Sequence, residues 1–242
     1  MLPELFHVHH NLFVDDIPYW LELAAAQDGA ILELGCGTGR VINPLVQSGY
    51  AVYGLDRDLE MLKLFNKLSR NEAHPHGHIF QAEAEHFRLA ARFALIIWPC
   101  NTMGTLREEA FSNVLIRVRR HLCEGGLFVA TMPNPQRLTS MQQEGETEIE
   151  ELITLPGSGL PLQVSSSWKR MGEEMAFNWH YDVLKPSGEV DRYTKTVAHK
   201  LHSLDEVKSF YASAGLNLRN VWGDFDRSSF KRESPYLIIE AH

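Results

Sequence analysis

The chain has 242 residues, 44% of them hydrophobic and 22% charged, as in an ordinary soluble globular protein that forms one large α/β domain or a domain with an insertion. Its net charge of −8 argues against a nucleic-acid groove, because phosphate binding relies on clustered Lys and Arg. Three scattered cysteines and no apolar run near ~20 residues argue against a disulfide framework and a membrane span, so we expect a cytoplasmic protein without membrane or nucleic-acid partners.

The N-terminal region is expected to be irregular over residues 1–14, where three histidines occur. A short helix should follow, because Asp15 or Asp16 can cap an N-terminus and Pro18 is tolerated in a first turn. The apolar side of this helix would carry Tyr19, Trp20, Leu23 and Ala24.

A glycine-rich turn comes next. The apolar run 31–34 ends in glycines at 35, 37 and 39, and an apolar pattern at helical spacing begins at Val41. That order predicts a buried strand, a tight turn and a helix start, where a ligand can lie against bare backbone and free N–H groups. The glycine of a dinucleotide-binding motif would stand at position 40, which is Arg40.

A second apolar strand, 51–55, ends in Asp56, which lies 21 residues beyond Gly35. A carboxylate at this point can accept both hydroxyls of a ribose, and about 20 residues is the spacing of such sites. A helix over 58–70 should follow, capped by Asp58 and burying Met61, Leu62, Phe65 and Leu68.

These segments closely resemble the class I S-adenosylmethionine-dependent methyltransferases, and within them the bacterial small-molecule N- and O-methyltransferases. The resemblance rests on residues 33–40, 54–56 and 61–62, covers most of the chain and is strongest from 15 to 135. It implies a Rossmann-like seven-stranded α/β sheet, S-adenosylmethionine as cofactor and an N-terminal helix folded over the cofactor. The alternative for that helix is packing on the sheet edge. The implied cofactor residues are Glu33, Gly35, Cys36, Gly37, Gly39, Asp56, Arg57, Met61, Glu83, Ala84 and Trp98.

The middle of the chain continues the alternation of strands and helices. The histidines at 74, 76 and 78 are expected in a surface loop rather than a metal site. Strand 79–81 leads to Glu83, at the position where the family has an aspartate that contacts the adenine amino group, and Glu85 is its rival. Strand 93–98 has Ala94 where the family commonly has an aspartate.

The loop 99–104 follows this strand at the end of the sheet where ligands bind. It resembles the family's loop beside the methyl group and the acceptor, which places Asn101 and Thr102 at the substrate. A capping box from Thr105 to Glu108 should start a helix over 106–121, and glycines at 125 and 126 should lead into strand 127–132.

Residues 136–200 interrupt the alternation with strand-like segments, which predict an inserted antiparallel sheet of three strands. We expect it to act as a substrate lid or a dimer contact, on a core made of 1–135 and 201–242. Trp179, His180 and Tyr181 are its candidate acceptor residues. A capping box from Ser203 to Glu206 and strands near 216–223 and 235–241 complete the core.

The implied reaction is methyl transfer to nitrogen or oxygen of a small molecule. The donor is already activated, so alignment of the reactants matters more than a base, and no catalytic residue is assigned. His180, His9 and His10 are candidate bases if the acceptor must lose a proton early. The alternatives are an RNA or protein methyltransferase, an NAD-dependent oxidoreductase and a non-catalytic module that senses the cofactor. A monomer and a homodimer both remain open.

Overall fold

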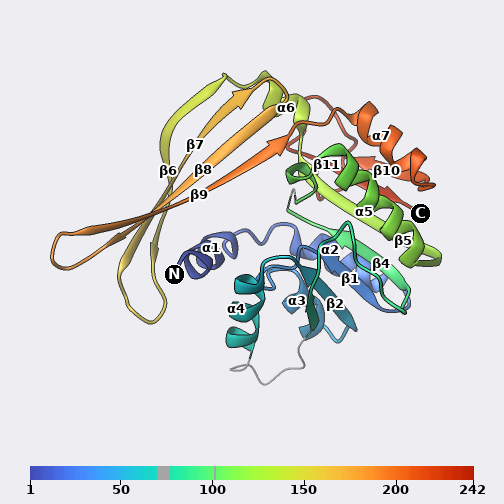
Figure 1. Cartoon of the computed structure of the whole chain (residues 1–242), viewed down its shortest axis with the longest axis horizontal. Helices are drawn as coiled ribbons and strands as arrows, with labels where there is room; N and C mark the ends of the chain where they lie inside the picture. Colours follow the sequence, from blue (N-terminus) through green and yellow to red (C-terminus); the bar gives the residue numbers. More distant parts are fainter. Residues whose placement is uncertain (70–76, 101) are drawn as a thin grey trace.

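The computed structural model describes residues 1–69, 77–100 and 102–242. Its centre is a seven-stranded sheet with the order β10-β11-β5-β4-β1-β2-β3 (Figure 1). The strands β1 to β5 are parallel to one another, and β11 runs antiparallel to both of its neighbours. This arrangement confirms the predicted Rossmann-like α/β sheet. The strands are β1 (Ile31–Leu34), β2 (Val52–Asp56), β3 (His78–Gln81), β4 (Phe93–Trp98), β5 (Leu122–Pro133), β10 (Leu218–Trp222) and β11 (Tyr236–Ala241).

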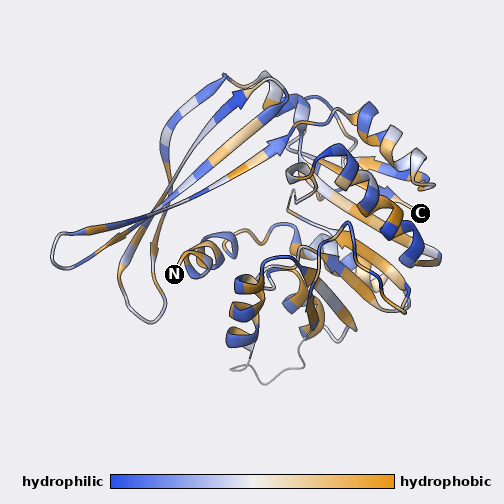
Figure 2. Ribbon diagram, viewed as in Figure 1, coloured by the Kyte–Doolittle hydropathy of each residue, from blue (hydrophilic) through white to orange (hydrophobic). Residues whose placement is uncertain are grey.

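Helices cover both faces of this sheet, which is why its central strands are apolar along their whole length. Ile96 and Trp98 of β4 pack in the cluster that holds α5 (Glu108–His121) and α7 (Leu204–Ser213). Leu95 and Ile97 point to the other face, because alternate residues of a strand face opposite sides. That face is covered by α2 (Ile17–Ala25), α3 (Ile42–Gln47) and α4 (Leu59–Ser69). Figure 2 shows apolar residues concentrated in this sheet and on the helix sides that face it.

The insertion forms a second, four-stranded antiparallel sheet with the order β6-β7-β8-β9, which extends away from the core (Figure 1). Its strands are β6 (Glu144–Thr154), β7 (Pro161–Met171), β8 (Glu174–Leu184) and β9 (Val190–Lys200), and α6 (Pro135–Ser140) connects β5 to it. The prediction of three strands was wrong. The missed strand, β6, lies at the edge of the sheet and is mostly exposed and rich in glutamate, so it lacks an apolar alternation.

A helix, α1 (Leu2–His10), occupies part of the region that was expected to be irregular. An isolated helix of nine residues is marginal in water, so tertiary packing must stabilise it. Leu5 supplies that packing, because it is 1% exposed and belongs to the same buried cluster as Val164 and Tyr181 of the four-stranded sheet. On the other side, Glu4 pairs with Lys67 of α4 at 2.9 Å. The prediction of an irregular start was therefore wrong for residues 2–10.

Two of the predicted helix caps are confirmed and a third was wrong. The capping box from Ser203 to Glu206 is confirmed at the start of α7, and Asp58 accepts the backbone N–H of Glu60 at 2.9 Å. The capping box from Thr105 was wrong, because Thr105 lies in the 3-10 helix η1 (Thr102–Thr105) and donates to the carbonyl of Thr102. Helix α5 instead begins at Glu108 without a side-chain cap. The described helices include none long and apolar enough to span a membrane.

Candidate functional site

A cleft opens at the carboxyl ends of β1, β2 and β4. It lies where the strand order of the sheet changes direction, because β2 pairs with one edge of β1 and β4 with the other. Open α/β sheets bind ligands at such a point. The space in the cleft, counted together with its open mouth, is about 490 Å³. Its lining residues are Gly35, Leu55, Asp56, Arg57, Ala82, Glu83, Ala84, Glu85, Trp98, Thr102, Thr105 and Leu106.

The glycine turn that follows β1 forms one wall of the cleft. Gly35 has a φ of 72°, and a Cβ at this position would lie 3.2 Å from the side chain of Thr102. Gly39 has a φ of 96°, and a Cβ there would lie 2.6 Å from the ring of Phe65. Glycine is required at both positions by conformation and by space. The absence of a side chain at Gly35 leaves space in the cleft beside Thr102. At Gly39 it lets the turn pack closely against Phe65 of α4.

Asp56 is held in place by backbone N–H groups. Its Oδ2 accepts from Gly37 and its Oδ1 from Asp58, each at 2.8 Å. Burial raises the pKa of Asp56, while these two N–H groups lower it. Each carboxylate oxygen has a second lone pair, so the side chain can accept two further hydrogen bonds from a ligand in the cleft. This arrangement fits the two adjacent hydroxyls of a ribose.

Two buried polar atoms near the cleft have no partner among the described residues, Glu33 Oε2 and Trp98 Nε1. Unpaired buried polar atoms are rare and call for a ligand or another explanation. Burial raises the pKa of Glu33 strongly, and Arg40 partly opposes that effect. A carboxyl oxygen next to the glycine turn and an indole donor in the cleft wall fit a ligand that brings its own polar groups. The residues present thus fit a nucleoside that carries an amino acid, such as S-adenosylmethionine.

Arg40 joins three segments around the glycine turn. Its guanidinium forms two bonds with the Asp16 carboxylate, at 2.5 and 2.7 Å, and donates to the carbonyl of Phe13 and to Cys100 Sγ. Asp16 is 1% exposed and also accepts from Trp20 Nε1. It is therefore a buried ion-pair partner, and α2 has no side-chain cap, contrary to the prediction. In the sequence, Arg40 stands out only as a departure from a glycine motif, so this role was not predicted.

Helix α1 lies over the glycine turn and contacts the four-stranded sheet. His7 Nδ1 lies 2.8 Å from Thr38 Oγ1 in the turn. His9 contacts Tyr181 OH at 3.2 Å through Nδ1 and Glu150 Oε2 at 3.3 Å through Nε2. These contacts connect the glycine turn, α1 and the sheet. By contrast, α2 packs on the seven-stranded sheet through Tyr19 and Trp20.

His10 predicts a pH dependence of stability. Burial lowers its pKa to about 3, and its ring stacks on Phe6. Below about pH 6.5 the unfolded chain binds a proton that the folded chain does not, so stability falls as the pH decreases toward 3. We expect His10→Gln to remove about 2 kcal/mol of the loss between pH 7 and 5, at about 1.4 kcal/mol per unit below 6.5. Urea unfolding at both pH values measures this, with the exposed His86→Gln as control; an unchanged pH dependence in His10→Gln would contradict it.

The predicted cofactor residues fall into two groups. Gly35, Asp56, Arg57, Glu83, Ala84 and Trp98 line the cleft, and so does Glu85, the rival of Glu83. The lining does not include Glu33, Cys36, Gly37, Gly39 and Met61. Of these, Gly37 acts through Asp56, and Cys36 is buried with its pKa raised by that burial. Leu55, Ala82, Thr105 and Leu106 were missed, although Leu55 and Ala82 lie at the ends of β2 and β3, a position that points to the cleft.

The predicted acceptor residues do not all lie together. Thr102 lines the cleft, and Asn101 lies outside the described residues. Trp179 and Tyr181 face α1, whereas His180 points to the opposite side of the sheet, where its Nδ1 lies 2.9 Å from Thr194 Oγ1. His74 and His76 also lie outside the described residues, and within those residues no group of acidic, His or Cys side chains is arranged to hold a metal ion.

The family model and the similar proteins described below are all methyltransferases. Residues 31–126 match the family model described as a methyltransferase domain. YqeM of Bacillus subtilis (strain 168), which is provisionally named a methyltransferase, is 22% identical over 228 residues, 92% of this chain and 87% of that protein. The dTDP-3-amino-3,6-dideoxy-alpha-D-glucopyranose N,N-dimethyltransferase of Streptomyces fradiae is 22% identical over 78% of this chain and 70% of its own length. An S-adenosylmethionine-dependent methyltransferase from Clostridium acetobutylicum ATCC 824 shares the fold, with a TM-score of 0.80 at 12% identity over 93% of this chain and 91% of its own.

Proposed function

We propose that this chain, a class I S-adenosylmethionine-dependent methyltransferase, transfers the methyl group to a nitrogen or an oxygen of a small molecule. The observation that carries the proposal is the cleft at the ends of β1, β2 and β4, in which Asp56 is fixed by Gly37 and Asp58. The four-stranded sheet and α1 stand beside this cleft, and we infer that they act as a lid that favours a small acceptor. The N,N-dimethyltransferase relative, whose name specifies an amino sugar, supports an acceptor of this size.

The residues have distinct roles in this proposal. Asp56 would bind the ribose hydroxyls, Glu33 the ammonium of the cofactor, and Glu83 or Glu85 the adenine amino group. When bound, S-adenosylmethionine supplies a methyl group on a positively charged sulfur. The protein then has to hold the acceptor in line with that group, and alignment alone can lower a barrier by ~7–11 kcal/mol. Thr102 lines the cleft next to Gly35 and is the described residue best placed to orient the acceptor.

The same geometry supports a mechanism without a dedicated base. His180, one candidate base, lies on the side of the sheet away from α1. His9, another candidate, already has both ring nitrogens next to Tyr181 and Glu150. We therefore infer that an acceptor amine reacts in its neutral form, with the chain providing position and shielding from water. Asn101, which was predicted to orient the acceptor, stays a proposal.

Asp56→Ala tests the cofactor site. The variant loses the ribose acceptor and also frees the backbone N–H of Gly37, so we expect binding of S-adenosylmethionine to weaken by about 1–3 kcal/mol, or roughly 5- to 150-fold. Isothermal titration calorimetry measures this, with the exposed Asp15→Ala as matched control. Preferential binding of NAD by the wild-type protein would contradict the assignment. Methyl transfer to a panel of small amines and phenols, compared with RNA and protein, tests the acceptor class.

A further inference from the structure

One face of the four-stranded sheet carries aromatic side chains toward α1. Tyr181 is buried there with Leu5, and Trp179 and Tyr193 pack around the same cluster. Alternate residues of a strand share a face, so Phe177 belongs to it together with Trp179. Residues directly opposite each other on paired strands also share a face, so Val197 and Lys195 belong to it through their registers with Phe177 and Trp179. The rings of Phe177 and Trp179 stack with centroids 6.0 Å apart and planes at 19°. We call Phe177, Trp179, Tyr193, Lys195 and Val197 the inner face.

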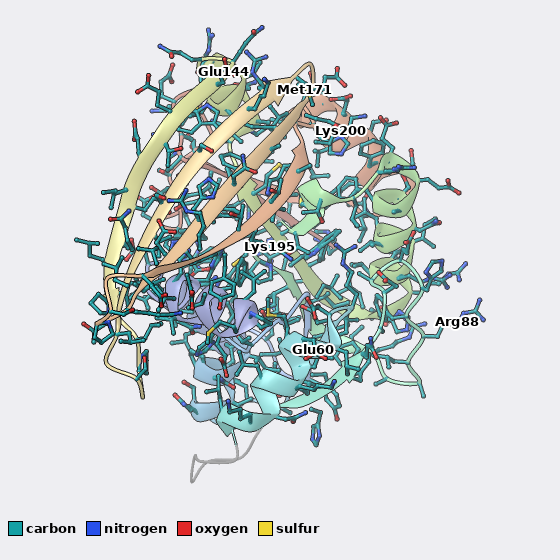
Figure 3. The ribbon with its side chains drawn as sticks, turned by 60° about the vertical axis from the view of Figure 1, so that its left-hand side comes forward. Glu60, Arg88, Glu144, Met171, Lys195 and Lys200 are labelled. Carbon is teal, nitrogen blue, oxygen red and sulfur yellow. The ribbon has the colours of Figure 1, made fainter. Side chains whose placement is uncertain are left out.

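This face continues to the cofactor cleft. Strand β9 packs against η1, whose Thr102 and Thr105 line the cleft. The last residue of β9, Lys200, forms an ion pair with Glu108 of α5 in the core. Figure 3 shows Lys195 on β9, on the side of the sheet toward the core. A molecule methylated in the cleft therefore meets the inner face where it extends beyond η1.

Lys195 differs from the other lysines of the chain. Each of them forms an ion pair with a carboxylate, except the exposed Lys231. Lys195 is half-buried, yet it has no ion pair, hydrogen bond or cation–π contact with any described residue. Two carboxylates of this sheet have other partners, because Glu150 of β6 pairs with His9 and Asp191 of β9 pairs with Lys185. The protein carries a net charge of −8, so a half-buried lysine without a carboxylate partner is not explained by a shortage of acidic residues.

A lysine ammonium without a partner in the protein can be matched by an anion that accepts its hydrogen bonds. The rings beside it offer apolar area for a flat or apolar group. We propose that Lys195 binds a carboxylate or phosphate of the methyl acceptor while the body of the acceptor packs on Trp179 and Phe177. This inference rests on the proposed function and narrows it, because it assigns an anionic small molecule as the acceptor class.

The test is calorimetric binding of matched probes to the full chain in saturating S-adenosylhomocysteine. Indole-3-acetate with indole-3-acetamide examines carboxylates, and thymidine 5′-monophosphate with thymidine examines phosphates. We expect the wild type to bind one of the two anions roughly tenfold more tightly than its uncharged counterpart, as for one charge-assisted hydrogen bond. Lys195→Met should abolish this preference, Lys195→Arg should retain most of it, and Lys231→Met, the matched control, should leave it unchanged.

Three results would overturn the proposal: no preference for either anion in the wild type, a preference that survives Lys195→Met, or an equal loss in Lys231→Met. Affinity for S-adenosylhomocysteine should be the same in all four proteins, which separates this site from the cofactor site. Methylation of neutral small molecules without any preference for anions would overturn the role of Lys195 and leave the proposed function standing. Failure to methylate any small molecule, with the preference for anions intact, would instead overturn the proposed function.

Discussion

Replacing Asp16 with alanine should lower the free energy of unfolding by about 3–5 kcal/mol, the range for removing one partner of a buried ion pair. Asp16 is 1% exposed, and its carboxylate accepts two bonds from Arg40 and one from Trp20 Nε1. The substitution leaves the largely buried guanidinium without its counter-charge and the indole N–H without an acceptor. Because Arg40 directly follows the glycine turn, cofactor affinity should fall as well.

Urea unfolding monitored by circular dichroism measures this change, and the exposed neighbour Asp15→Ala is the matched control. The double variant Asp16→Ala/Arg40→Leu should recover part of the loss, because it no longer buries an unpaired charge. A loss below about 1 kcal/mol in Asp16→Ala would place the pair among surface ion pairs, whose contribution is that small. In that case the connection between α2 and the glycine turn would not depend on this pair.

The sequence predicted those parts of the site that depend on short-range patterns. The glycine turn and the carboxylate at the end of β2 are each encoded within a few residues, and both lie at the cleft. The role of Arg40 could not be predicted in this way, because its partners come from residues 13, 16 and 100. Helix α1 was missed for the same reason, since Leu5 is buried by strands more than 150 residues later in the chain.

The predicted acceptor residues Trp179, His180 and Tyr181 cannot all face one ligand, because consecutive residues of a strand point to opposite faces. The two aromatic residues therefore face α1, and His180 faces the other way. The same rule, applied after the strand register is known, places Lys195 beside Trp179. The registers of β8 and β9 connect residues 6 to 26 positions apart and had no signal in the sequence.

Removal of the four-stranded sheet should separate cofactor binding from turnover. All residues that line the cleft precede the insertion, so a variant with residues 142–201 replaced by a short linker should still bind S-adenosylmethionine. Turnover should fall by more than about a hundredfold, because an acceptor without the inner face is no longer held in line, and a misplacement of ~1 Å already costs that much. Calorimetry and methyl-transfer assays measure the two quantities.

The deletion also exposes Leu5, which now packs on the sheet, so circular dichroism must first show that the variant is folded. The double variant Phe177→Ala/Trp179→Ala keeps the sheet and α1 and removes only apolar area from the inner face. It should reduce turnover while cofactor affinity stays within about twofold, because neither ring lines the cofactor cleft. Full activity in a folded deletion variant would refute the lid, and full activity in the double variant would show that the acceptor does not pack on the inner face. If the deletion is inactive and the double variant is normal, the sheet contributes by holding α1 over the glycine turn through His9 and Leu5 rather than by contacting the acceptor.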